Sequence, residues 1–84
     1  MRLLDIGFGN FLAVERILTV ISPESAPIKR LTREARDAGR LIDCTYGRSA
    51  RTVLVCDTDH VALSALDPAE LAERLGHIRT GDTA

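Results

Sequence analysis

The sequence is poor in aromatic residues: its 84 residues include two Phe, one Tyr and no Trp. A core must therefore be built mainly from Val, Ile, Leu and Ala. It will also be small, because a chain of this length buries only about 60% of the surface that it exposes when unfolded. One domain is expected, and association with copies of itself would bury more surface. The hydrophobic share of 45% indicates a globular chain rather than a disordered one.

Long apolar runs and frequent cysteines are also missing. No segment approaches the roughly 20 apolar residues that cross a membrane, and the N-terminal stretch MRLLDIGFGN has no apolar signal-peptide segment. We therefore expect a cytoplasmic protein with no membrane partner. The two cysteines, Cys44 and Cys56, lie in strand-like runs, which is typical of buried small apolar residues rather than of a disulfide framework.

The motifs that hold nucleotides are incomplete. GFGN, residues 7–10, contains Gly-x-Gly but no third glycine follows, and the chain has no GKS or GKT. The two glycines are better explained by unusual backbone angles in a tight loop. Phe8 and Phe11 are equally well explained as core residues or, with Asn10, as a patch that contacts a neighbouring subunit.

Metal and catalytic chemistry have little support in the sequence. Asp57, Asp59 and His60 are suitable ligand types, but no further ligand follows at a fixed spacing, and acidic turns between strands are common for local reasons. Neither Ser25 nor Ser49 has a base nearby in sequence. We therefore expect neither an enzyme nor a bound metal or cofactor.

The pattern of elements predicts an α+β fold, with a small twisted, mostly antiparallel sheet, one long amphipathic helix and a short C-terminal helix. Ser25 as N-cap, Pro27 in the first turn and Gly39 after the last turn predict the long helix over 25–39. Its inner face would carry Ile28, Leu31, Ala35 and Ala38, and its outer face Lys29, Arg33, Arg36 and Arg40.

The strands are read from β-branched apolar runs. RILTVI, residues 16–21, is apolar enough to be buried on both faces. Two strands at 41–44 and 51–56 would be joined by a turn at Gly47. A short strand at 2–6 and another at 60–66 complete the sheet, and Asp67 with Pro68 begins the second helix. The expected domain covers residues 1–76, followed by a flexible tail at 77–84.

Charge is segregated along the chain although the net charge is only −1. Up to Arg51 there are nine basic and six acidic residues, a balance of +3, whereas the remainder carries two basic and six acidic residues, a balance of −4. Segregation of this kind creates local potentials that the net charge conceals.

Three arginines border strands, and two of them are close together. Arg48 and Arg51 are separated only by Ser49 and Ala50 in TYGRSARTVLV, and Arg16 precedes RILTVI. Pairing with Asp43, Glu15 or Asp57 is the ordinary explanation for one surface arginine. Two in one short turn repel each other, which favours an anion, and phosphate suits the planar guanidinium fork. Lys29, Arg30, Arg33 and Arg36 form a possible secondary basic face.

Several strings together resemble the RemA-like family, the bacterial extracellular matrix regulatory protein A group, from about Leu4 to Leu75. They are IGFGNFLAVERI, VISPESAPIKRL, EARDAGRLIDCTYGR and the DTDHVALSAL segment with LAERL. The resemblance implies a LytTR-like fold and a ring-forming homo-oligomer. It also implies a transcriptional regulator that wraps double-stranded DNA and activates biofilm-matrix or related genes.

The same resemblance assigns roles to residues. It implies that Arg16 and Arg48 contact DNA and that Pro27 sets the start of a helix. Family members often carry a second arginine directly after the position of Arg48, where this chain has Ser49, and Arg51 is the expected substitute. The alternative function is a non-enzymatic interaction scaffold whose arginines bind an acidic protein.

Overall fold

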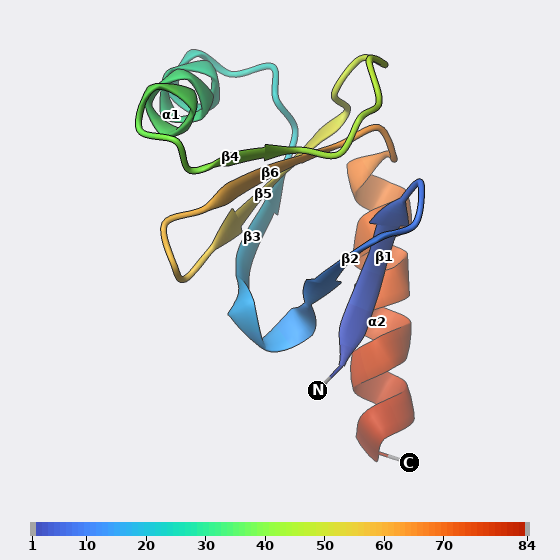
Figure 1. The fold of residues 1–84 in the computed structure, drawn as a ribbon. Helices are drawn as coiled ribbons and strands as arrows, with labels where there is room; N and C mark the ends of the chain where they lie inside the picture. Colours follow the sequence, from blue (N-terminus) through green and yellow to red (C-terminus); the bar gives the residue numbers. More distant parts are fainter. Residues whose placement is uncertain (1, 84) are drawn as a thin grey trace.

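The computed structural model describes residues 2–83, with side chains described as far as Ile78. Two sheets and two helices make up an α+β fold (Figure 1). Strands β1 (Leu3–Gly7) and β2 (Asn10–Ala13) form a two-stranded antiparallel sheet. A 3₁₀ turn, η1 (Val14–Arg16), leads into the larger sheet.

The larger sheet has four strands in the order β3-β5-β6-β4. They are β3 (Ile17–Ile21), β5 (Thr52–Cys56), β6 (Val61–Ser64) and β4 (Leu41–Asp43). Strand β5 pairs antiparallel with β3 and β6, and β4 pairs parallel with β6. The prediction of mostly antiparallel pairing is confirmed, but the strands form two sheets rather than one.

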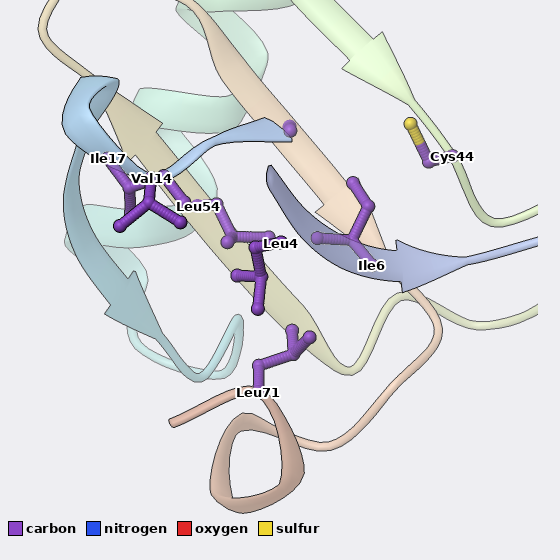
Figure 2. Packing of buried hydrophobic residues seen from close by; sticks show 8 residues of the cluster. Leu4, Ile6, Val14, Ile17, Cys44, Leu54 and Leu71 are labelled. Carbon is purple, nitrogen blue, oxygen red and sulfur yellow. The ribbon is translucent and has the colours of Figure 1, made fainter. Parts of the chain in front are cut away.

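Successive side chains of a strand point to opposite faces of the sheet, so those of the central strands β5 and β6 enter two different hydrophobic clusters. Leu54 and Ala62 point into the first cluster, which β1, η1, β3 and the helix α2 (Pro68–Thr83) complete. Figure 2 shows Leu4, Leu54 and Leu71 of this cluster close together between β1, β5 and α2. Val53, Val61 and Leu63 point to the opposite face, under the helix α1 (Ala26–Asp37).

The start of α1 follows the sequence prediction closely. Ser25 is the N-cap, its hydroxyl accepts a hydrogen bond from the Ile28 N–H at 3.4 Å, and Pro27 lies in the first turn. Gly39 has φ of +73°, which glycine adopts without a steric penalty. Ala35 is buried, but Ala38 is exposed, because it is already the C-cap of the helix.

Two further strand predictions are wrong. β3 is an edge strand, with Leu18 67% exposed, so the segment 16–21 is not buried on both faces; β5 and β6 occupy that position instead. Strands 41–44 and 51–56 do not form a hairpin, because β6 lies between β4 and β5. The order of the strands is set by pairing between segments that are distant along the chain, and the periodicity of the sequence carries no information about such pairing.

The C-terminal helix is also longer than expected. α2 has 16 residues against 12 in α1, and it continues past Gly76 to Thr83. Residues 77–83 of the expected tail are therefore helical, and Ala84 lies outside the described residues. Arg74 links α2 to β1, because its guanidinium lies 3.5 Å from the Asp5 carboxylate of β1. The same guanidinium lies 3.3 Å from the carboxylate of Glu70, one turn earlier on α2.

Candidate nucleic-acid interface

The connection between β4 and β5, residues 44–51, carries Arg48, Ser49 and Arg51; we call it the arginine loop. It crosses over the end of β6 (Figure 1, green to yellow). Its start is fixed by Asp43, whose carboxylate accepts from the Thr45 hydroxyl at 2.6 Å and from the Thr45 N–H at 2.9 Å. At its end, the Arg51 N–H donates to the Ser64 carbonyl at 2.8 Å. Both ends of the loop are therefore anchored.

Arg48 stands in a stack of three side chains. The Phe8 and Tyr46 rings are 5.1 Å apart and 7° from parallel, and the Arg48 guanidinium carbon lies 5.5 Å from the centre of the Phe8 ring. Tyr46 is 75% exposed. Stacking and the cation–π contact limit the freedom of the arginine while leaving it in solvent.

The backbone beneath this stack is unusual. Phe8 and Tyr46 have φ of +54° and +53°, and Gly47, between Tyr46 and Arg48, has φ of +80°. Non-glycine residues in the left-handed region cost free energy and cluster at functional sites. Of the three non-glycine residues with positive φ among those described, two, Phe8 and Tyr46, stack on each other, and the third is Asp59 in the β5–β6 turn.

Arg48 also has no acidic partner among the described side chains, those up to Ile78: none of their carboxylates lies within 4.0 Å of its guanidinium. Arg51 pairs with Asp67 at 3.2 Å, with the two side chains 61% and 57% exposed. Arg48, Ser49 and Arg51 together line an open concavity of about 470 Å³. The structure thus brings three predicted DNA-binding residues together.

Arg16 does not join this group. It ends η1 and pairs with Asp57 at 3.3 Å, in the turn after β5, and the Asp57 N–H also donates to the Arg16 carbonyl. Arg51 and Asp57 stand at opposite ends of β5, about 20 Å apart at the rise of an extended strand. Pairing with Asp57, the ordinary explanation, accounts for Arg16 within one protomer.

Tyr46 is the residue that sequence reasoning missed. A Tyr-Gly pair in a polar turn was a possible signal, because an aromatic ring there cannot reach the core. Its partner Phe8 lies 38 residues earlier, so their stacking was not readable from spacing. The phenylalanines are 44% and 55% exposed at positions 8 and 11, which rules out core positions in the protomer.

The predicted interface patch is thereby divided. Phe8 supports Arg48, and the Asn10 side chain donates to the Gly7 carbonyl at 3.0 Å within the β1–β2 turn. Phe11 lies opposite Asp5 on the outward face of the two-stranded sheet, on the same side as the half-exposed Leu3. Contact with another subunit through these residues stays a prediction.

The remaining candidates have local explanations. Asp57, Asp59 and His60 lie in the β5–β6 turn, where the Asp57 carboxylate is held by Arg16 and a His60 ring nitrogen lies 2.8 Å from the Thr58 hydroxyl. Among the side chains that the structure describes, no three of His, Cys, Asp or Glu converge to hold a metal. Cys44 and Cys56 are buried and free, and burial raises the pKa of both thiols.

The side chains of the possible secondary basic face are exposed in the protomer. Lys29, Arg30, Arg33 and Arg36 all project from α1 into solvent. Among the described residues, neither helix is both long and apolar enough to cross a membrane.

Known proteins resemble this chain over most of its length. The RemA-like family, described as extracellular matrix regulatory protein A-like, matches residues 3–75. A relative from Desulfitobacterium hafniense is 54% identical over all of this chain and 92% of its own. Relatives from Heliobacterium modesticaldum and Desulforudis audaxviator are 52% and 57% identical, over 100% and 89% of this chain and 96% and 79% of their own.

All three relatives carry the name "Putative regulatory protein". These names and the family indicate a regulatory protein rather than an enzyme. The resemblance read from the sequence strings is confirmed, and the chain belongs to the RemA-like family.

Proposed function

We propose that this protein is a DNA-binding transcriptional regulator that holds phosphates with its arginine loop and assembles into a closed ring. One observation carries the proposal. Arg48 is placed in solvent, braced by Phe8, and has no carboxylate within ion-pair distance among the described residues. A guanidinium kept exposed, ordered and unpaired is prepared for an external anion, and phosphate matches its planar fork.

The neighbours of Arg48 are suited to the same anion. The Arg51–Asp67 pair is exposed on both sides, and exposed ion pairs contribute only about 0–1 kcal/mol. A phosphate can therefore replace Asp67 at little cost. Ser49 supplies a hydroxyl donor in the same concavity.

One protomer offers too few contacts for firm binding. Each phosphate neutralised releases counterions and contributes a salt-dependent term to affinity. A ring repeats the arginine loop along one bent duplex, and repeated contacts on one ligand multiply affinity. Phosphate contacts carry little base information, so we expect preference for bendable or AT-rich repeats through DNA shape.

Ring assembly would use the outward face of the two-stranded sheet. Leu3 and Phe11 are 52% and 55% exposed there, and burying them against a copy would add to the small core of a domain of this size. Arg16 lies far from Arg48 within one protomer, beside Asp57. In the ring it would therefore contact the DNA at a different place from Arg48. The genes controlled would include those for the biofilm matrix, and the protein would act in the cytoplasm.

The test is fluorescence anisotropy of a long and a short AT-rich duplex at several salt concentrations. We expect wild type to bind the long duplex far better, with a steep salt dependence. In Arg48→Ala the slope of log affinity against log salt should fall by about 0.9 for each protomer that engages DNA. Arg40→Ala removes the same charge from an exposed position outside both the arginine loop and the possible secondary basic face, and serves as the matched control.

Analytical ultracentrifugation of each variant establishes that assembly is intact. Wild-type affinity and slope in an intact Arg48→Ala oligomer would refute the arginine-loop contact. A wild-type chain that stays monomeric would refute the ring.

A second candidate function is an interaction scaffold for an acidic protein. The observation in its favour is that Arg16 and Arg51 already hold carboxylates, those of Asp57 and Asp67. A nuclease-resistant complex with one stoichiometric acidic protein, lost in Arg48→Ala, would select this function over DNA binding.

A further inference from the structure

The turn that precedes Arg48 has a tyrosine at a position where tyrosine is unfavourable. The Arg48 N–H donates to the Thr45 carbonyl at 3.0 Å, and the two residues between them, Tyr46 and Gly47, have φ of +53° and +80°. Two central residues with positive φ are typical of a type I′ turn, in which Asn-Gly is a preferred pair. The turn itself therefore does not explain the tyrosine.

Burial within the protomer does not explain the tyrosine either. Tyr46 has the largest exposed fraction among the large hydrophobic residues that the structure describes. Phe8 covers one face of its ring, with the two planes 7° from parallel, so a residue this exposed presents its other face to solvent. A flat apolar surface thus lies beside Arg48, which has no acidic partner among the described side chains.

The exposed ring is nevertheless held in place from two directions. Phe8, which stacks on it, comes from the β1–β2 turn, and the same Phe8 ring lies 5.5 Å from the guanidinium carbon of Arg48. Directly before Tyr46, the Thr45 N–H and hydroxyl both donate to the Asp43 carboxylate. A side chain that is already ordered loses little conformational entropy when it binds. The ring is therefore pre-organised for a contact outside the protomer.

We propose that the free face of Tyr46 stacks on a nucleobase that becomes exposed where the bound duplex is kinked. This inference rests on the proposed function, because it adds a second kind of contact to the same loop. Arg48 would hold a phosphate, and Tyr46 would lie against the base of a nearby nucleotide. The loop would then read DNA deformability through an identified side chain.

The geometry of the ring selects a kinked step rather than a straight duplex. Bases within a straight duplex are covered on both faces by their neighbours. Tyr46 has only one free face, so it cannot lie between two stacked base pairs as an intercalator does. DNA that bends around a ring opens most easily at pyrimidine–purine steps, and stacking on an aromatic side chain offsets part of the cost of unstacking there.

The test compares two duplexes of equal length and charge that differ at one bulged nucleotide. One bulge is an unpaired adenosine and the other is an abasic nucleotide, so both duplexes bend easily but only one offers a free base. Fluorescence anisotropy measures the affinity for each. Wild type should bind the adenosine-bulge duplex at least about fivefold more tightly, the scale of one base stacked on an aromatic ring.

Two variants separate the ring from the backbone and from the charge. Tyr46→Asn suits the turn, so the variant should fold, as circular dichroism establishes, yet it should bind the two duplexes equally. Tyr46→Phe keeps the ring and should discriminate as wild type does. The salt dependence should be the same in all three proteins, because Arg48 keeps its contact with Phe8 and its phosphate.

Discrimination that persists in Tyr46→Asn would overturn the inference. Its loss in Tyr46→Phe would do the same, because the contact would then belong to the hydroxyl. Altered sedimentation of Tyr46→Asn would also overturn it, by placing the ring in a contact between subunits. If wild type binds neither duplex, the proposed function fails together with this inference. If wild type binds both duplexes equally, with a steep salt dependence, only the stacking contact fails.

Discussion

Replacing Ser64 by alanine should destabilise the fold strongly although it removes a single oxygen atom. Ser64 is fully buried at the end of β6. Its hydroxyl donates to the Ile6 carbonyl at 2.7 Å and accepts from the Leu66 N–H at 3.1 Å. It therefore links the four-stranded sheet to β1 of the smaller sheet and fixes the chain as it turns toward α2.

The size of the effect follows from the two groups left without a partner. Ile6 is skipped in the pairing of β1 with β2, where the register shifts between Asp5 and Gly7, so the smaller sheet offers its carbonyl no regular partner. An unsatisfied buried donor or acceptor costs about 1–3 kcal/mol. Because the Leu66 bond is only partly buried, we expect a total loss of about 2–4 kcal/mol.

The measurement is urea unfolding at a fixed protomer concentration, since assembly would couple stability to concentration. The midpoint should fall with the slope unchanged, because the surface exposed on unfolding is the same. Ser49→Ala, at an exposed position, is the control and should stay within about 0.5 kcal/mol. A loss below about 0.5 kcal/mol in Ser64→Ala would refute the reasoning.

Three further predictions concern titration and backbone. Burial raises the pKa of the Cys44 and Cys56 thiols, so both should react slowly with a thiol reagent at pH 8 and quickly in urea. Stability should also fall as pH rises past the ordinary thiol pKa of about 9, because only the unfolded chain then ionises. Thr45→Val should raise the pKa of Asp43 toward its usual value, measured by carboxyl NMR titration, because the hydroxyl bond is the main cause of the lowered pKa. In wild type the contribution of Asp43 is complete above pH of about 3.8 and is lost as pH falls through its lower folded pKa. Gly39→Ala should cost about 1 kcal/mol in thermal unfolding, since φ there is +73°; an unchanged midpoint would contradict this.

Local signals predicted a large part of the fold. The limits of α1 depend on Ser25, Pro27 and Gly39, each of which acts on its own helix end. Pro68 begins α2 for the same reason. The second helix was expected to end at Gly76, but packing of α2 against β1 and β3 outweighs the low helix propensity of one glycine.

The candidate site was predicted less completely. Arg48, Ser49 and Arg51 are close in sequence and remain close in space. The support that Phe8 gives to Arg48, and the separation of Arg16 from both, depend on segments distant along the chain. The acidic half of the chain also supplies Asp57 and Asp67 to the arginines, which the charge count along the chain did not indicate.

The amino-acid sequence by itself determined where helices begin and which arginines lie in one loop, because these depend on residues within a few positions of each other. The tertiary structure alone decided that β4 pairs with β6 and that Phe8 stacks on Tyr46. Those features arise where non-local segments meet. Their free energy comes from pairing and packing that periodicity along the chain does not encode.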